Sequence, residues 1–171
     1  MTDPPQINDL SSLIAENIKF RNTKFLNDDN AEYGIFDHES RVETRARIWR
    51  IRNGDLRKMM RRFPTDEPVH DQCALWIHGV AGRQFFPDAN HRTAIALLRK
   101  LLKDNGMPQP QWSPWAIQAT RRESKRQILQ KIEDNEAVRL DTLYERDALY
   151  QVWRDFFERE LSLPKSESET G

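Results

Sequence analysis

Apolar residues recur at helical spacing through segment 95–102, which reads IALLRKLL. Ile95, Leu98 and Leu102 fall at i, i+3 and i+7, so they share one face of an α-helix. No segment alternates apolar and polar residues as a half-buried strand does, and no Val/Ile-rich run occurs. Gly and Pro residues instead separate about five to seven helical segments. We therefore expect an all-α helical bundle with the helix around segment 95–102 at its centre.

The chain length of 171 residues suits one domain with a substantial core better than two. Pro4 and Pro5 mark residues 1–8 as a flexible N-terminal lead, and Asp9 is expected to cap a first helix. A last helix is expected over about residues 141–161, from Asp141 to Leu161. The segment after it, SLPKSESETG, is rich in Ser and Glu and predicts a disordered tail. We thus predict a lead at 1–8, a single domain at 9–161 and a disordered tail at 162–171.

The charge balance excludes a globally basic nucleic-acid binder, because Lys plus Arg and Asp plus Glu both total 27. The single Cys73 allows no intramolecular disulfide and suits a reducing compartment. No apolar run approaches the length of a membrane span, and the first residues lack the character of a signal peptide. We expect a soluble, cytoplasmic protein with no membrane partner.

Residues 83–94, RQFFPDANHRTA, hold an unusual set of polar groups where a Gly/Pro-rich turn feeds a helix. Asp88 lies at the junction, where its side chain can accept from the amides of the first helical turn. Those amides and the positive end of the helix dipole favour an anion. Asn90 and Arg92 add an amide and a guanidinium, and Asp88 can hold Mg²⁺ that bridges phosphate oxygens. The segment predicts a phosphate site.

The pattern x-F-x-D-A-N-x-R-T-A in this segment resembles the signature of the Fic/Doc (Fido) family. The resemblance extends over about residues 70–106, including His78 and segment 101–106, LLKDNG. It implies a Fic/Doc-like helical bundle around a central motif helix, with a small flap before the motif. Such proteins transfer AMP, another nucleotidyl group or, in the Doc branch, a phosphate from a nucleoside triphosphate to a protein hydroxyl. Thr93-Ala94 resembles the Doc branch more, since the AMP-transferring branch usually has a second Arg where Ile95 stands.

The resemblance also implies roles for individual residues and partners. Asp88 would hold Mg²⁺, Arg92 would stabilise charge in catalysis, and the phosphates would lie against the residues that open the helix, namely Ala89, Asn90, His91 and Arg92. Mg²⁺ and a nucleoside triphosphate, with ATP as first choice, are the expected cofactors. A target protein or the antitoxin of a toxin–antitoxin system is the expected partner.

Gln84 departs from the family pattern, because it stands where the family has its catalytic His. A carboxamide cannot take the proton of an attacking hydroxyl, and a positioned base contributes about 10²- to 10⁴-fold in rate. Phosphoryl transfer depends mainly on positioning and electrostatics, so nucleotide binding does not require that base. Two hypotheses follow: an impaired transferase, and an inactive pseudoenzyme that binds a nucleotide or a partner.

Two histidines near Gln84 are the alternatives for a base. His91 lies in the first helical turn, where the dipole favours its neutral form, but its family position lies beside the phosphates. His78 belongs to the apolar segment 74–80, where a ring hydrogen-bonded to backbone between packed helices is the favoured interpretation. We therefore expect that neither histidine replaces the missing base.

Two further features have a regulatory and a structural interpretation. Segment 12–17, SLIAEN, resembles the inhibitory S/T-x-x-x-E-G/N helix motif, but the second Arg that its Glu16 would pair with is absent, so a solvated face is favoured. The polar loop 27–37 and the Asn53-Gly54 turn are candidates for the flap, which binds a target chain by strand addition, or are ordinary connections.

Basic residues are dense in segment 39–63, where they spread around the helical wheel, and Asn53-Gly54 is expected to divide this segment into two helices. A basic adaptor for nucleic acid therefore ranks third among the hypotheses. Segment 121–126, RRESKR, is interpreted as a solvated face of a helix that begins after the Ser113 cap. The inner face of that helix is assigned to Trp115, Ala119, Ile128 and Ile132. Four scattered His and one Cys do not predict a zinc site.

Overall fold

The fold is all helical, as predicted, in a computed structural model that describes residues 5–108 and 111–170, with side chains to 161. The elements are α1 (Ala15–Asn27), α2 (Arg41–Trp49), α3 (Asn53–Arg62), α4 (Val69–Ile77), the π-helix η1 (His78–Gly82), α5 (Asn90–Asp104), α6 (Pro114–Glu133) and α7 (Ala148–Thr170). No strand occurs in the described stretches. None of the described helices combines the length and apolar character that crossing a bilayer requires.

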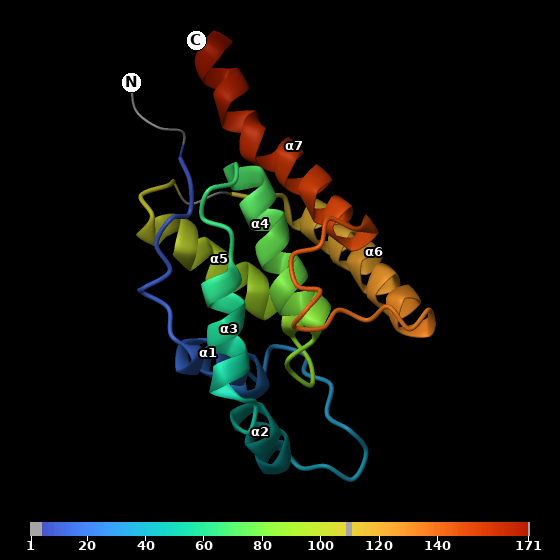
Figure 1. The fold of residues 1–171 in the computed structure, drawn as a ribbon. Helices are drawn as coiled ribbons and strands as arrows, with labels where there is room; N and C mark the ends of the chain where they lie inside the picture. The colour runs from blue at the N-terminus through green and yellow to red at the C-terminus, as the bar shows by residue number, and fades with distance from the viewer. Residues whose placement is uncertain (1–4, 109–110, 171) are drawn as a thin grey trace.

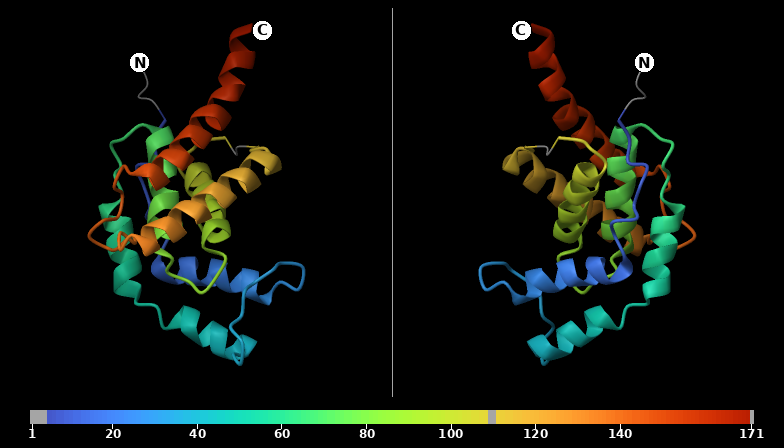
Figure 2. Two further views of the ribbon diagram at one scale, coloured as in Figure 1. Left: turned by 90° about the vertical axis from the view of Figure 1, so that its right-hand side faces the viewer. Right: turned by 90° about the vertical axis from the view of Figure 1, so that its left-hand side faces the viewer.

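Helices α4 and α5 share the interior of the bundle (Figure 1). Helix α4 packs on α5 and α7, and α6 packs on α7, while α1 lies against α2, α3 and α5. The predicted apolar face of α5 is buried: Leu98 and Leu101 are fully inaccessible to solvent. Burying one such side chain stabilises the fold by about 1.5–3 kcal/mol relative to leaving it exposed. Figure 2 shows α1 and α2 at one end of the molecule and the C-terminal half of α7 projecting from the other.

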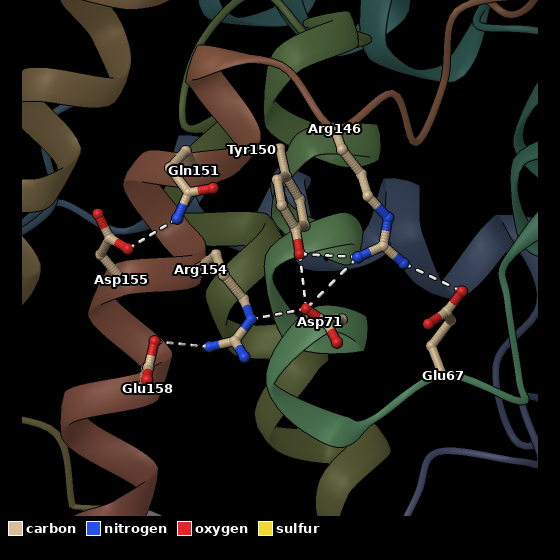
Figure 3. A network of polar contacts seen from close by, with 8 residues as sticks. All are labelled: Glu67, Asp71, Arg146, Tyr150, Gln151, Arg154, Asp155 and Glu158. Atoms are coloured by element: carbon tan, nitrogen blue, oxygen red, sulfur yellow. Dashed lines mark hydrogen bonds and ion pairs between the residues drawn. The ribbon is translucent and has the colours of Figure 1, made fainter.

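A polar network joins α4 to α7 (Figure 3). Asp71 on α4 accepts from the Tyr150 hydroxyl and from Arg154 Nε, both at 2.6 Å, and lies 3.5 Å from Arg146. Arg146 also pairs with Glu67 at 3.0 Å. Burial acts to raise the pKa of Asp71, but the bonds from Tyr150 and Arg154 outweigh it and lower the pKa. The carboxylate therefore stays charged and holds α7 against α4.

The turn that follows α4 is a π-helix, η1, whose backbone is packed closely. A Cβ atom at Gly79 would lie 2.9 Å from Tyr144 Cε1, and one at Gly82 would lie 3.0 Å from Leu149 Cδ2. Tyr144 in turn donates to the carbonyl oxygen of Met59 at 2.6 Å. The two glycines thus let the segment before the site approach the C-terminal part of the chain.

The N-terminal lead is less free than predicted. Residues 1–4 lie outside the described residues, but Ile7 is fully buried and exchanges two 2.8 Å hydrogen bonds with the Gln72 side chain. Asp9 does not cap α1; it accepts from the Ser11 amide in a separate turn, and α1 begins at Ala15. The buried Ile7 side chain and its paired backbone hold this segment in place, although its two prolines predicted a flexible lead.

Helix α7 differs from the prediction at both ends. It begins at Ala148 because Asp147 accepts from the Tyr150 amide at 2.9 Å, which is where the helix can start. Its backbone continues to Thr170, through most of the segment for which composition predicted disorder, 162–171. Lys, Ser and Glu in this stretch have moderate to good helix propensity, whereas Pro164 removes one backbone donor from the interior of the helix.

Other boundaries are close to the predictions. The basic segment divides at residues 50–52, and Asn53 and Gly54 open α3 instead of separating the helices. Helix α6 begins as predicted, with the Ser113 hydroxyl accepting from the Ala116 amide and a proline at the first helical positions. Its assigned inner face is wrong in part, since Trp115 is 83% exposed and Ala119 and Ile132 are exposed too.

Candidate functional site

A cavity of about 360 Å³ lies at the N-terminal end of α5. Its walls come from the loop before α5, from the first turn of α5, from α6 and from the α1–α2 loop with α2. The lining includes every residue that the sequence assigned to the site: Gln84, Asp88, Ala89, Asn90, His91 and Arg92. The structure therefore brings the candidate residues to one place.

The loop enters α5 in a strained backbone conformation. Gln84 has φ 54° and Ala89, the residue before the helix, has φ 60° and ψ 27°, which is left-handed. This region costs a residue with a Cβ roughly 1–2 kcal/mol. Such strain persists where the surroundings impose it, and it concentrates at binding and catalytic sites.

No described side chain caps α5, so the capping role predicted for Asp88 is wrong. The reason is that the Asp88 carboxylate points to another partner, the amide of Gly34, at 2.6 Å. The first backbone bond of the helix runs from the Thr93 amide to the Ala89 carbonyl oxygen. The amides ahead of Thr93 are those that a helix leaves without internal partners, and they open an anion site at the positive end of the dipole.

Asn90 holds the loop in place through its side chain. Its Oδ1 accepts from the Phe86 amide and its Nδ2 donates to the Phe86 carbonyl oxygen, both at 3.0 Å. Asn90 is buried, and both polar atoms of its carboxamide are used in this way. The predicted phosphate contact of Asn90 is therefore available from its backbone amide, while its side chain shapes the loop.

Asp88 and Arg92 form a charged pair at the N-terminal end of α5. Arg92 Nη2 lies 3.7 Å from Asp88 Oδ2 and also donates to the carbonyl oxygen of Glu32. The buried Nε of Arg92 has no hydrogen-bond partner among the described residues. The charge of Arg92 thus faces a distant carboxylate, a neutral carbonyl and the Phe25 ring, 5.1 Å away, which leaves it able to bind a stronger anion.

Three further cations line the cavity that the sequence did not assign to it. Arg121 and Lys125 come from α6, one turn apart, and Arg47 comes from α2. Arg47 is already paired with Glu39 at 3.0 Å. Burial and the nearby charge of Arg92 lower the pKa of Arg121, and the Arg121 Nε is buried without a partner in the described part of the chain. Asp88 is the one acidic residue of the lining, so positive charge is in excess.

No family model, no curated protein and no solved structure matches this chain. The resemblance at residues 83–94 therefore stays a prediction.

His91 is buried, and its ring is hydrogen-bonded within the core, so it is poorly suited to act as a base. Its Nε2 lies 2.6 Å from the Ser124 hydroxyl on α6, which also accepts from Trp153 Nε1 at 2.9 Å. Burial, with a smaller contribution from Arg121 and Lys125, lowers the pKa of His91 to about 3. A neutral ring with so low a pKa accepts a proton poorly, so the side chain of His91 serves to join α5 to α6 and α7.

His78 is also buried, but its partner is a carboxylate and not the backbone as predicted. Its Nε2 lies 3.1 Å from Asp147 Oδ2, which also pairs with Lys131 Nζ at 2.8 Å. Burial acts to raise the pKa of Asp147, but the hydrogen bonds from His78 and Lys131 hold it well below its usual range. His78 does not line the cavity. It links η1 to the segment before α7.

Glu16 lies away from the cavity, and of the two flap candidates only the loop after α1 contacts the site. Glu16 accepts from Asn53 Nδ2 at 2.8 Å, so it joins α1 to α3 and does not line the cavity. The sequence favours a solvated position for Glu16, but its side chain is half-buried and hydrogen-bonded to Asn53. The Asn53-Gly54 turn opens α3, whereas the loop after α1 reaches Asp88 and Arg92 through Gly34 and Glu32.

Gln84 is exposed and lies where two cavities meet. It lines the large cavity and also a smaller one of about 100 Å³ beside Arg83, Ile128 and Val138. No group of three or more His, Cys, Asp or Glu that could hold a metal occurs in the described residues. Magnesium does not need such a group: one or two carboxylates with substrate phosphates suffice, and Asp88 fits that requirement.

Proposed function

We propose that the cavity binds the polyphosphate of a nucleoside triphosphate with Mg²⁺, and that the chain is a Fic/Doc-like transferase to a protein hydroxyl. The observation that carries the proposal is the excess of cations, Arg92, Arg121 and Lys125, around one carboxylate at the open end of α5. Like charges that face each other in a partly buried site repel one another, and an anion bound between them relieves that repulsion. A triphosphate supplies that charge.

In this proposal each group has a defined role. The first amides of α5 and the Arg92 guanidinium bind phosphate oxygens, with Arg121 and Lys125 on the opposite wall. Asp88 is the residue that would hold Mg²⁺, which supplies charge neutralisation between phosphates. The acceptor hydroxyl oxygen forms the new bond to phosphorus while the bridging oxygen of the nucleotide leaves. The leaving group is the nucleoside diphosphate when the γ-phosphate is transferred, and it is pyrophosphate when a nucleotidyl group is transferred.

The proton of the acceptor hydroxyl has no receiving side chain at Gln84, so it passes to solvent. Transfer is then slower by about the factor that a positioned base contributes, 10²- to 10⁴-fold. This observation favours a second candidate: a pseudoenzyme that binds a nucleotide or a partner without turnover. A toxin that modifies a cytoplasmic target and is held by an antitoxin is the setting we propose for the first candidate.

The test is calorimetric titration of the full chain with ATP, GTP, UTP and CTP, with and without Mg²⁺. We expect saturable binding that Mg²⁺ strengthens. Arg92→Ala and Arg121→Ala should each weaken it by about tenfold to a hundredfold, the effect of one charge-assisted contact. Arg122→Ala is the matched control, because Arg122 is an exposed neighbour on α6 outside the cavity lining.

Equal affinity in all three variants would place the nucleotide elsewhere and refute the site. Absence of binding to every nucleotide would refute the nucleotide function altogether. Binding without transfer to protein in a cell extract supplied with labelled nucleotide would favour the pseudoenzyme.

A further inference from the structure

We infer that residues 32–36, which we call the strap, inhibit the site by placing backbone groups where phosphate and magnesium would bind. The strap belongs to the loop between α1 and α2, and it crosses the N-terminal end of α5. This inference rests on the proposed function, because it concerns the regulation of the same cavity.

The carbonyl oxygen of Glu32 stands in for a phosphate oxygen. Arg92 Nη2 donates to it, and Arg92 is the guanidinium that the proposal assigns to the phosphates. A carbonyl oxygen is a neutral acceptor, so it binds a guanidinium more weakly than a phosphate does. The strap thus covers Arg92 with a partner that a phosphate can displace.

The Gly34 amide stands in for a cation. It donates to Asp88 Oδ2 at 2.6 Å, and Asp88 is the carboxylate assigned to Mg²⁺. A Cβ at Gly34 would lie 3.4 Å from the same oxygen, which is an ordinary contact distance, so an alanine at this position can keep the same amide contact. Two consecutive contacts of one strap therefore occupy both functional groups, one with an acceptor and the other with a donor.

Tyr33 anchors the strap between those two contacts. Its hydroxyl donates to Asn22 Oδ1 at 2.8 Å and accepts from the Asp88 amide at 3.4 Å. The anchor explains why the strap rests on Asp88 and Arg92 and not beside them.

The far end of the strap belongs to the cavity wall. The Phe36 ring lies 4.4 Å from the Arg47 guanidinium, and both residues line the cavity. A ligand that displaces Glu32 and Gly34 would therefore also move a wall that it contacts. Ligand and strap compete for the same groups. The apparent dissociation constant of the ligand is therefore the intrinsic one divided by the fraction of molecules in which the strap is open.

The test removes the Gly34 donor and keeps the rest of the strap. Gly34→Pro has no amide hydrogen, whereas Gly34→Ala retains it and is the matched control. Binding of inorganic triphosphate with Mg²⁺ to the full chain is measured by calorimetry, after circular dichroism has checked the helical content. We expect Gly34→Pro to bind about three- to tenfold more tightly than Gly34→Ala and the natural chain, the effect of one hydrogen bond.

A second measurement needs no substitution. Hydrogen exchange at the strap amides of the natural chain is followed with and without Mg²⁺ and triphosphate, and we expect the Gly34 amide to exchange faster when the ligand is bound.

The outcomes separate the two proposals. Triphosphate binding that is equal in the three proteins, with unchanged exchange, would overturn the strap and leave the phosphate site standing. Weaker binding by Gly34→Pro alone would also overturn the strap, because the amide would then support Asp88 as a metal ligand. No binding to any of the three proteins would overturn the proposed function and the strap with it.

Discussion

Asn22 on α1 donates from its side-chain amide to the carbonyl oxygen of Asp88, at 2.9 Å, across 66 residues of sequence. The same amide donates to the Thr93 hydroxyl at 2.9 Å, and Asn22 Oδ1 accepts from Tyr33. Asn22 is fully buried. One side chain thus connects α1, the strap and the start of α5, so the geometry of the site depends on a residue that does not line the cavity.

Asn22→Ala should destabilise the protein by about 2–3 kcal/mol, because it leaves buried partners without their hydrogen bonds. Urea denaturation followed by circular dichroism measures this. Asn27→Ala, at the exposed C-terminal end of the same helix, is the control and should change stability by less than about 0.5 kcal/mol. Equal effects of the two substitutions would show that the Asn22 connections contribute little.

Gln84→His should produce transfer to a protein target that the natural chain performs slowly or not at all. A base placed at this position is expected to raise the rate by about 10²- to 10⁴-fold. The measurement is labelling of proteins in an extract by nucleotides labelled on the α- or the γ-phosphate, which separates nucleotidyl from phosphate transfer. Gln84→Ala should remain as slow as the natural chain, and adding Arg92→Ala should abolish the gain. A Gln84→His protein that labels nothing would contradict the transferase proposal.

Ala89→Gly should be neutral or stabilising, within about 0.5 kcal/mol, because glycine adopts the left-handed conformation of this position without strain. Ala96→Gly, inside α5, should instead destabilise by about 1 kcal/mol. Thermal denaturation of the two variants gives the comparison. A loss at position 89 as large as that at position 96 would mean that the Ala89 methyl group matters more than its backbone strain.

His91 should make stability fall as pH falls. Its pKa is lowered from 6.5 to about 3, so between these values the unfolded chain binds a proton that the folded chain does not. The free energy of unfolding then falls by up to about 1.4 kcal/mol per pH unit below pH 6.5, and this dependence is absent above it. Urea denaturation at pH 7 and pH 5 measures the change before most carboxylates titrate. His91→Gln should remove most of the difference, and an unchanged difference would assign it to other groups.

Asp71→Ala should cost about 2–4 kcal/mol, because it leaves Arg154 and Tyr150 without their shared partner in the network between α4 and α7. Asp155→Ala is the control, since Asp155 is an exposed acceptor for Gln151 on the side of α7 that faces away from Asp71 (Figure 3). Its loss should change stability by less than about 0.5 kcal/mol. A small effect at Asp71 would show that apolar packing alone holds α7.

The sequence predicted the helical class, and it grouped the candidate residues Gln84 to Arg92 in one segment, because both depend on local patterns. The apolar spacing of segment 95–102 defines the buried face of α5, and the turn before it brings Gln84 to Arg92 into one cavity. Arg121 and Lys125 were interpreted as a solvated face because a charge on a helix does not reveal which neighbour it faces. Only the packing of α6 beside α5 turns them toward Arg92.

The remaining differences also arise from contacts between distant residues. Ile7 is buried because Gln72 pairs with its backbone, and His78 meets Asp147 because η1 packs against the segment before α7. Trp115 is 83% exposed although it stands at an apolar position of the helical pattern. Patterns within one segment predict which face is apolar, but they do not predict whether another segment covers it.

The π-helical turn at His78–Gly82 makes the site sensitive to chain length as well as to residue type. A π turn accommodates one residue more than an α turn, and each residue of an α-helix advances the chain by about 100° around the axis. Loss of one residue here would let α4 continue as a regular helix and would rotate the departure of the loop toward Gln84. Insertions and deletions in this short segment would therefore redirect the loop that carries Gln84 and Asp88 while leaving the apolar core of α4 unchanged.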